Sequence, residues 1–217
     1  MTFTAVADVS RTLLELFRDE IDRRGNVVSI DRGSVDLVSP EEVSQDSNVR
    51  LGLYPYRVTE DGAAGSTTHQ IGESTKRDPP LPLALRYLLT AYPVGDDTEQ
   101  SSEMIAQQRT LGLALQILHD NSRLNPDDCA GGIDQDTSLT LSLTSEPLDE
   151  FTSLWSRFGD ATYRPSTTLE VRPVMIQSMN EEDFTRVADR ETGVSRRPDE
   201  PDVLNDDPPD REQPEKW

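Results

Sequence analysis

One stretch of this chain is apolar on both sides of an expected strand, and it constrains the fold more than any other feature. It reads LALRYLLTAY, residues 83 to 92, in a chain that is otherwise mostly polar. The side chains that alternate onto its two faces are Leu83, Leu85, Tyr87 and Leu89 on one, and Ala84, Leu88 and Tyr92 on the other. A strand that is apolar on both faces is buried on both faces. We therefore expect this segment at the centre of a sheet that is covered above and below.

Three segments show the spacing of amphipathic helices. They are residues 4 to 24, 99 to 119 and 147 to 158. For the second segment, the spacing predicts an apolar face formed by Met104, Gln108, Leu111, Leu115 and Leu118. For the third, it predicts one formed by Phe151, Leu154, Trp155 and Phe158.

Shorter segments alternate or are β-branched and read as further strands. They are residues 26 to 30, 34 to 38, 48 to 58, 138 to 144 and 168 to 176. In the strand at 138 to 144, Leu139, Leu141 and Leu143 are expected to point inward. Residues 59 to 80 read as a long loop. The fold class is therefore α+β: a single mainly antiparallel or mixed sheet flanked by three helices.

The chain divides in composition near residue 180. Residues 1 to 180 contain every expected helix and strand and are predicted to form one domain. Residues 181 to 217 contain five prolines, many charges and few apolar anchors. Such a segment buries too little apolar surface to fold alone, so we expect an acidic tail that is extended or disordered unless bound.

The charge is strongly one-sided: 41 acidic residues against 21 basic ones give a formal net charge of −20. Only two of the basic residues are lysines. This field disfavours nucleic acid and anionic membranes as partners, and no segment is apolar enough to insert in a membrane. Few lysines and many acids are typical of halophile proteins, because at about 1 M salt the Debye length is about 3 Å and carboxylates no longer repel strongly. An ordinary acidic protein is the alternative. We expect a cytoplasmic protein.

Groups for catalysis or for a metal are scarce. His69 and His119 are far apart, and Cys129 is the only cysteine, so neither a disulfide nor a Cys-based metal site is expected within the chain. The Asp127–Asp136 segment contains four aspartates, but its spacing differs from that of an EF-hand, so calcium is the weaker interpretation and a plain acidic surface the stronger. The sequence indicates no enzyme and no cofactor. An enzyme that uses these aspartates and the loop at 59 to 80 remains an alternative.

Several segments together resemble the N-terminal domain of the cap, or tail-terminator, proteins of extracellular contractile injection systems. These segments are LLELF, LGLYPYRV, PPLPLALRYLLTAY, EMIAQQRTLGLALQILHD, SLTLSLTSEPLDE, LWSRFGDATYRPS and LEVRPVMI. The resemblance covers roughly residues 3 to 178, and it extends neither to the tail nor to the strong acidity. The acidity points to a haloarchaeal-type member of the family.

The resemblance implies a structural role. Caps of this family form a six-fold ring at the end of a phage-tail-like particle opposite the baseplate, and the ring closes the last layer of tube and sheath. Copies of the chain, the tube protein and the sheath protein are therefore the expected partners, in a particle that is assembled in the cytoplasm and can be released. A baseplate or tube-initiating adaptor is the alternative within the same particle. The candidate interface residues are Arg57, Arg77, Trp155 and Tyr163, and Trp155 is also a candidate core residue because of its spacing from Phe151 and Phe158.

Overall fold

The computed structural model describes residues 3–25, 30–44, 46–64, 69–70, 75–93, 100–131 and 137–183. All of these belong to one compact unit. Its main sheet has six strands in the order β1-β2-β5-β8-β7-β6. The strands are β1 (Val35–Leu37), β2 (Leu51–Glu60), β5 (Leu81–Ala91), β6 (Arg123–Leu124), β7 (Leu139–Thr144) and β8 (Ser166–Ile176).

Every neighbouring pair in this sheet is antiparallel except β1 and β2, which run parallel. The sheet is therefore mixed. Three helices accompany it, namely α1 (Ala5–Arg24), α2 (Gln100–Asp120) and α3 (Leu148–Trp155), with short 3-10 turns at Arg32–Ser34, Pro40–Glu42 and Pro126–Asp128. The expected α+β class is confirmed.

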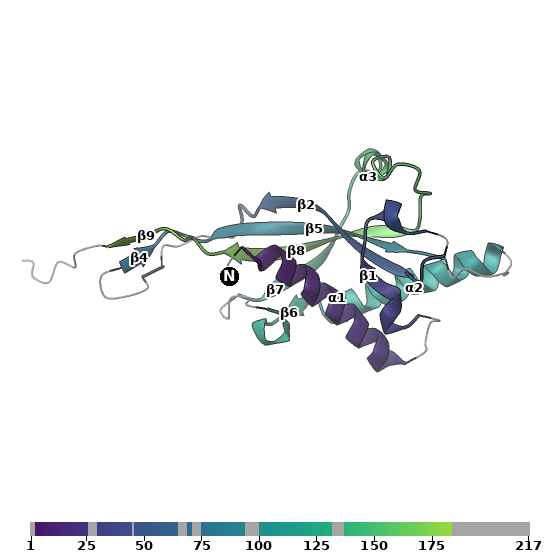
Figure 1. Cartoon of the computed structure of the whole chain (residues 1–217), viewed down its shortest axis with the longest axis horizontal. Coiled ribbons are helices and arrows are strands. Elements are labelled where there is room, and N and C mark those ends of the chain that lie inside the picture. The colour runs from purple at the N-terminus through teal and green to yellow at the C-terminus, as the bar shows by residue number, and fades with distance from the viewer. Residues whose placement is uncertain are drawn as a thin grey trace, which may run out of the picture. The chain divides into compact units, whose positions relative to one another are not determined.

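The helices cover both faces of the sheet: α1 and α2 lie on one face and α3 lies on the other, as Figure 1 shows. Side chains of α1 and α2 belong to one large apolar cluster with one face of β1, β2, β5, β7 and β8. Side chains of α3 belong to a second, smaller cluster on the other face. The strand β5 is covered by both clusters, with Leu85 and Leu89 facing the first and Leu88 facing the second. The prediction that residues 83 to 92 are buried on both faces is therefore confirmed.

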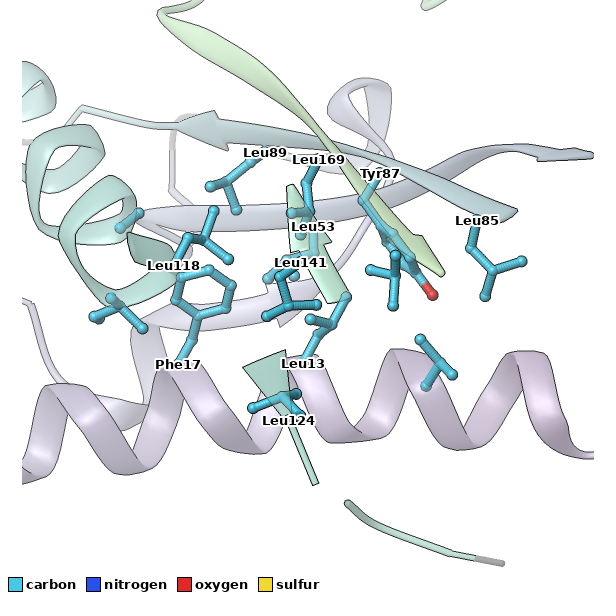
Figure 2. Packing of buried hydrophobic residues seen from close by; sticks show 14 of the residues in the cluster. Leu13, Phe17, Leu53, Leu85, Tyr87, Leu89, Leu118, Leu124, Leu141 and Leu169 are labelled. Atoms are coloured by element: carbon cyan, nitrogen blue, oxygen red, sulfur yellow. The ribbon is translucent and has the colours of Figure 1, made fainter. Parts of the chain in front are cut away.

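The larger cluster forms where α1 packs on the middle strands. Figure 2 shows Leu13 and Phe17 pointing from α1 toward Leu53, Leu89 and Leu169 of the sheet, and all five are 0 or 1% exposed. Full burial of a side chain of this size contributes about 1.5–3 kcal/mol. One buried polar contact completes the packing, a hydrogen bond of 2.8 Å between the hydroxyl groups of Ser10 and Tyr87.

The predicted face of α2 is wrong. The side chains buried in the structure are Gln107, Thr110, Leu113, Ala114, Ile117 and Leu118, so only Leu118 is shared with the prediction. Met104 is exposed and Leu111 and Leu115 are half-buried. Because α2 carries apolar residues all around its circumference, a second stripe at the same spacing looks equally apolar in the sequence.

Leu143 also differs from its prediction. Leu139 and Leu141 are buried as expected, but Leu143 is 53% exposed. The edge strand β6 pairs with β7 at Leu139 and Thr140, and the backbone N–H of Leu141 still bonds to Ser122. Beyond that point β7 still pairs with β8, but no described strand lies on its other side, so Leu143 sits at an open edge of the sheet.

The loop expected at 59 to 80 is partly ordered as strand. β2 continues to Glu60, and β3 (His69–Gln70) and β4 (Thr75–Arg77) form a small sheet with β9 (Glu181–Asp183) in the order β3-β4-β9. Residues 181 to 183, which the sequence assigned to the tail, therefore form a strand, and the tail from residue 184 lies outside the described residues. So do residues 26 to 29 of the expected first strand.

Candidate assembly surface around α3

The helix α3 is short and is held to the sheet by aromatic side chains. Pro147 precedes the first residue, where a missing N–H costs nothing, and Gly159, four residues after the last one, adopts a positive φ of 57°. Trp155 and Phe158 join Leu88 of β5 in the smaller cluster, against which Phe151, Leu154, Tyr54 and Tyr56 pack. Trp155 contacts Phe158 edge to face at 5.7 Å between ring centroids, and Phe158 contacts Tyr54 at 5.4 Å.

The structure places Trp155 in this cluster as a core residue. It is 5% exposed, and its indole N–H donates a hydrogen bond of 3.2 Å to the hydroxyl of Ser166 on β8. The exposed aromatic ring beside it is Tyr163, which is 57% exposed. The ring of Tyr163 contacts the rings of Trp155 and Phe151, at centroid distances of 5.3 and 6.2 Å respectively. A partner that docks here would therefore meet Tyr163, while Trp155 supports it from below.

A charged network joins the segment before α3 to the sheet. Arg86 of β5 donates hydrogen bonds to Glu146 at 2.7 Å and to Glu170 of β8 at 3.0 Å. The hydroxyl of Tyr56 donates to the same Glu146 oxygen at 3.2 Å. Burial, together with the negative charge of Glu146, raises the pKa of Tyr56 to about 12. The phenol therefore stays protonated and remains a donor throughout the neutral range.

Two hollows flank α3. The first, of about 750 Å³, is lined mainly by β2 and α3 residues, including Tyr56, Arg57, Glu146, Phe151 and Arg157. The second, of about 690 Å³, lies at the end of α3 and includes Arg50, Tyr92, Glu103, Trp155 and Arg164.

The arginines at these hollows differ from most others in the domain. Eight described arginines are ion-paired with carboxylates, namely Arg11, Arg18, Arg23, Arg24, Arg32, Arg77, Arg86 and Arg172. Arg57 and Arg157 in the first hollow, and Arg50 and Arg164 in the second, make no ion pair with a carboxylate of the described residues. Arg109 on α2 and Arg123 on β6 also make none, so four of the six described arginines without a carboxylate partner surround this one helix, which marks this surface as distinct.

Three of the four candidate interface residues thus come together. Arg57, Trp155 and Tyr163 lie around α3, on β2, in the helix and in the segment that follows it. Arg77 lies elsewhere, on β4 of the small sheet, where it is ion-paired with Glu181 of β9. Sequence reasoning missed Arg50, Arg157 and Arg164, because a lone arginine carries no signal until its neighbours are known.

The structure describes only some of the residues considered for catalysis or metal binding. Within the described ranges, no group of three His, Cys, Asp or Glu side chains is placed to hold a metal ion. Asp134 and Asp136 lie outside those ranges. The Cys129 thiol has its pKa raised to about 11 by burial and by the charge of Asp128, so it is a poor nucleophile at neutral pH. No helix among the described residues has the length and apolar character needed to cross a membrane.

Comparison with known proteins identifies a family model that matches the chain and solved structures with a similar fold. A family model described as the Pvc16 N-terminal domain matches residues 8–190. No curated protein sequence matches. Among solved structures, the chain is similar to the sheath/tube terminator of an extracellular contractile injection system (PVC, extended state), with 15% identity and a TM-score of 0.58 over 94% of this chain and 66% of that one.

A second solved structure has the same fold. The tube-terminating cap of the anti-feeding prophage is 17% identical, with a TM-score of 0.57 over 87% of this chain and 61% of that chain. The chain thus spans a little under two thirds of the length of both. Since the family model covers most of the sequence, the chain belongs to the Pvc16 N-terminal domain family.

Proposed function

We propose that this chain is a structural cap, or tail terminator, which closes the end of the tube and sheath of a phage-tail-like contractile injection particle. The observation that carries the proposal is the similarity of nearly the whole chain to two terminator proteins, at TM-scores of 0.58 and 0.57. A structural role also agrees with the aromatic rings and arginines that surround α3.

The cap would act as a ring of identical chains. A stack of rings always leaves one end unsatisfied, and a terminator must bind that end while offering no equivalent surface for the next layer. A closed ring requires two different patches on each chain, because neighbours meet head to tail. We propose six copies per ring, with the tube and sheath proteins below.

The surface around α3 is our candidate for one of these patches. Tyr163 and Arg57 offer an exposed aromatic ring and a cation without a described carboxylate partner, and both kinds of residue are enriched in interface hot spots. Trp155 would contribute by supporting Tyr163. Arg77, on the small sheet, is a candidate for a separate contact.

The setting we propose is a halophile, with the particle assembled in the cytoplasm. The support is the net charge of −20 with only two lysines. At molar salt the mutual repulsion of six such chains is strongly screened, which is the condition under which a ring of them can close.

The proposal is tested by omission. Tube and sheath proteins assembled with their baseplate should stop at a closed, uniform distal end when this chain is present, and should have open or irregular ends without it. A gold label on this chain should appear at the distal end. A label at the baseplate end would reject the cap and favour a baseplate or tube-initiating adaptor. Particles that assemble in normal number with unchanged distal ends in its absence would reject both.

A further inference from the structure

The outer edge of β2 is unpaired over most of its length in the described part of the chain. β1 pairs only with residues 51 to 53, whereas β5 follows β2 on the other side as far as Glu60. Soon after β1 ends, the chain forms the 3-10 turn at Pro40–Glu42 and does not continue beside β2. Among the described strands, residues 54 to 60 therefore have a neighbour on one side alone.

The backbone of this edge has groups that can bond to an added strand. The N–H of Asp61 donates to the carbonyl of Pro82 on β5, at 2.9 Å. Because backbone groups alternate in direction along a strand, the N–H and C=O groups of Val58 and Glu60 point away from β5. Both residues are exposed, and the side chain of Val58 is apolar and β-branched. An extended segment alongside β2 would bond to the backbone of both.

Pro55 restricts how such a segment can pair. The carbonyl of Leu53 accepts a hydrogen bond of 3.0 Å from the N–H of Val38 on the β1 side, so Pro55, two residues further along, also faces outward. Pro55 offers no N–H, and the register of β2 against β5 shifts between Pro55 and Arg57. Prolines and bulges protect an edge from indiscriminate pairing. This edge therefore favours a partner that also binds a surface beside it.

The first hollow supplies that surface, because it lies between β2 and α3. Its aromatic lining includes Tyr54, Tyr56 and Phe151. It also contains four carboxylates, those of Glu41, Glu146, Asp149 and Glu150. All of them except Glu146 lack an ion pair among the described residues. When a peptide adds to a sheet edge, backbone bonds give affinity and adjacent side-chain pockets give specificity, so an acidic, aromatic pocket selects a basic strand.

The first half of the tail has this composition. Residues 184 to 197 read FTRVADRETGVSRR and contain no proline, whereas residues 198 to 217 contain all five prolines of the tail. Four arginines against two acidic residues give residues 184 to 197 a net charge of +2, in a chain whose net charge is −20. The segment also contains residues that favour strands, namely Thr185, Val187, Thr192 and Val194.

We propose that residues 184 to 197 of a neighbouring copy add as a strand to the outer edge of β2, with their arginines against the carboxylates of the first hollow. The segment follows β9, which pairs with β4 beyond the last pair of β5 and β8, Leu81 with Ile176. α3 precedes β8 and contacts its first residue, Ser166, so the chain leaves the domain from the opposite end of β8. The choice of a neighbouring copy rests on this exit and on the proposed ring.

The contact is tested by photo-crosslinking in particles assembled with the full chain. Copies that carry a photo-crosslinking amino acid at position 187 are made in a normal and a heavy-nitrogen form and are mixed before assembly. Mass spectrometry then identifies the two positions joined and the isotope of each. We expect crosslinks to β2 or α3 residues of the first hollow, in pairs that join the two isotopic forms. Pairs that always share one isotope would assign the segment to its own chain and overturn the proposal.

The same experiment has two further outcomes that would overturn the proposal. One is a set of crosslinks confined to the tube protein, the sheath protein or other surfaces of this chain, and the other is no crosslink at all. These outcomes are independent of the cap itself, because the proposed function is judged by the end of the particle at which the chain is found. A chain at the baseplate that crosslinks as expected would keep the strand contact and reject the cap.

A charge swap tests whether the segment and the hollow meet directly. Asp149→Arg with Glu150→Arg should abolish the crosslink, and adding Arg186→Glu with Arg190→Glu should restore it. At about 1 M salt the Debye length is about 3 Å, so a rescue requires charges in close contact. Glu15→Arg is the matched control, because Glu15 is exposed on α1 and lines neither hollow. A swap without rescue, in variants whose circular-dichroism spectra match the parent, would overturn the assigned register of arginines on the hollow.

Discussion

Replacing Arg86 by methionine should destabilise the domain strongly, because it removes the cation that bridges Glu146 and Glu170, and among the described residues only Glu170 keeps another ion pair, with Arg172 at 3.5 Å. The guanidinium is 2.7 Å from Glu146 and 3.0 Å from Glu170, and the three side chains are 26, 12 and 14% exposed. Breaking a buried pair by removing one partner costs about 3–5 kcal/mol. Since Arg86 is partly open to solvent, we expect about 2–4 kcal/mol for Arg86→Met.

A compensated variant separates this charge effect from lost packing. With Glu146→Gln and Glu170→Gln added, no uncompensated charge remains, and we expect most of the lost free energy to return. The assay is urea unfolding of all variants in the same buffer and salt, followed by circular dichroism, with Arg109→Gln as an exposed control. An Arg86→Met variant within about 0.5 kcal/mol of the parent would refute the reasoning. So would a triple variant as unstable as the single one.

Three further predictions concern salt, the tail and alkaline pH. Lowering salt from about 1 M to about 0.1 M lengthens the Debye length from about 3 to about 10 Å, so thermal stability should fall, and equal melting temperatures at both ends would argue against the halophile setting. Deleting residues 185 to 217 should leave the circular-dichroism spectrum of the domain and its unfolding midpoint unchanged while weakening incorporation into particles, whereas a truncated chain that fails to fold would place the tail in the core. Burial raises the pKa of both Tyr87 and Tyr92 from 10 to about 12, and the folded state therefore favours the protonated phenols. The stability that the protonated phenols contribute is complete below pH 10 and is lost as pH rises toward 12, by about 1.4 kcal/mol per tyrosine at pH 11. The free energy of unfolding of Tyr87→Phe should therefore fall less between pH 9 and pH 11 than that of the parent. Equal falls would contradict the raised pKa of Tyr87.

The buried faces that could be predicted are those of elements whose apolar residues either define one side of a helix or occupy both faces of a strand. In α1 the polar and apolar sides are distinct, so Leu13 and Phe17 could be assigned to the core from spacing alone. In β5, apolar residues on both faces required a central strand, and the structure has β2 on one side of it and β8 on the other. In α2 the apolar residues surround the helix, and only the position of the sheet selects Gln107 and Thr110 for burial over Met104.

Pairings between distant segments were beyond the sequence. The small sheet joins Arg77 to Glu181 across more than a hundred residues, and its strands are two or three residues long and polar. Their opposite charges are a signal, since opposed cross-strand charges stabilise a sheet, but such pairs are common in a chain this rich in acid. Only part of the candidate surface around α3 could be predicted from the sequence, for the same reason. The aromatic spacing around Trp155 was visible in the sequence, whereas the arginines come from segments that only the fold brings together.

The central claim is tested most directly by cryo-electron microscopy of the distal end of an assembled particle. The account predicts a single terminal layer of six copies of this chain, which contacts both tube and sheath and carries no further layer. Each copy should meet its neighbours through two different patches, one of them around α3. A terminal layer that lacks this chain, or density for it at the baseplate alone, would contradict the account.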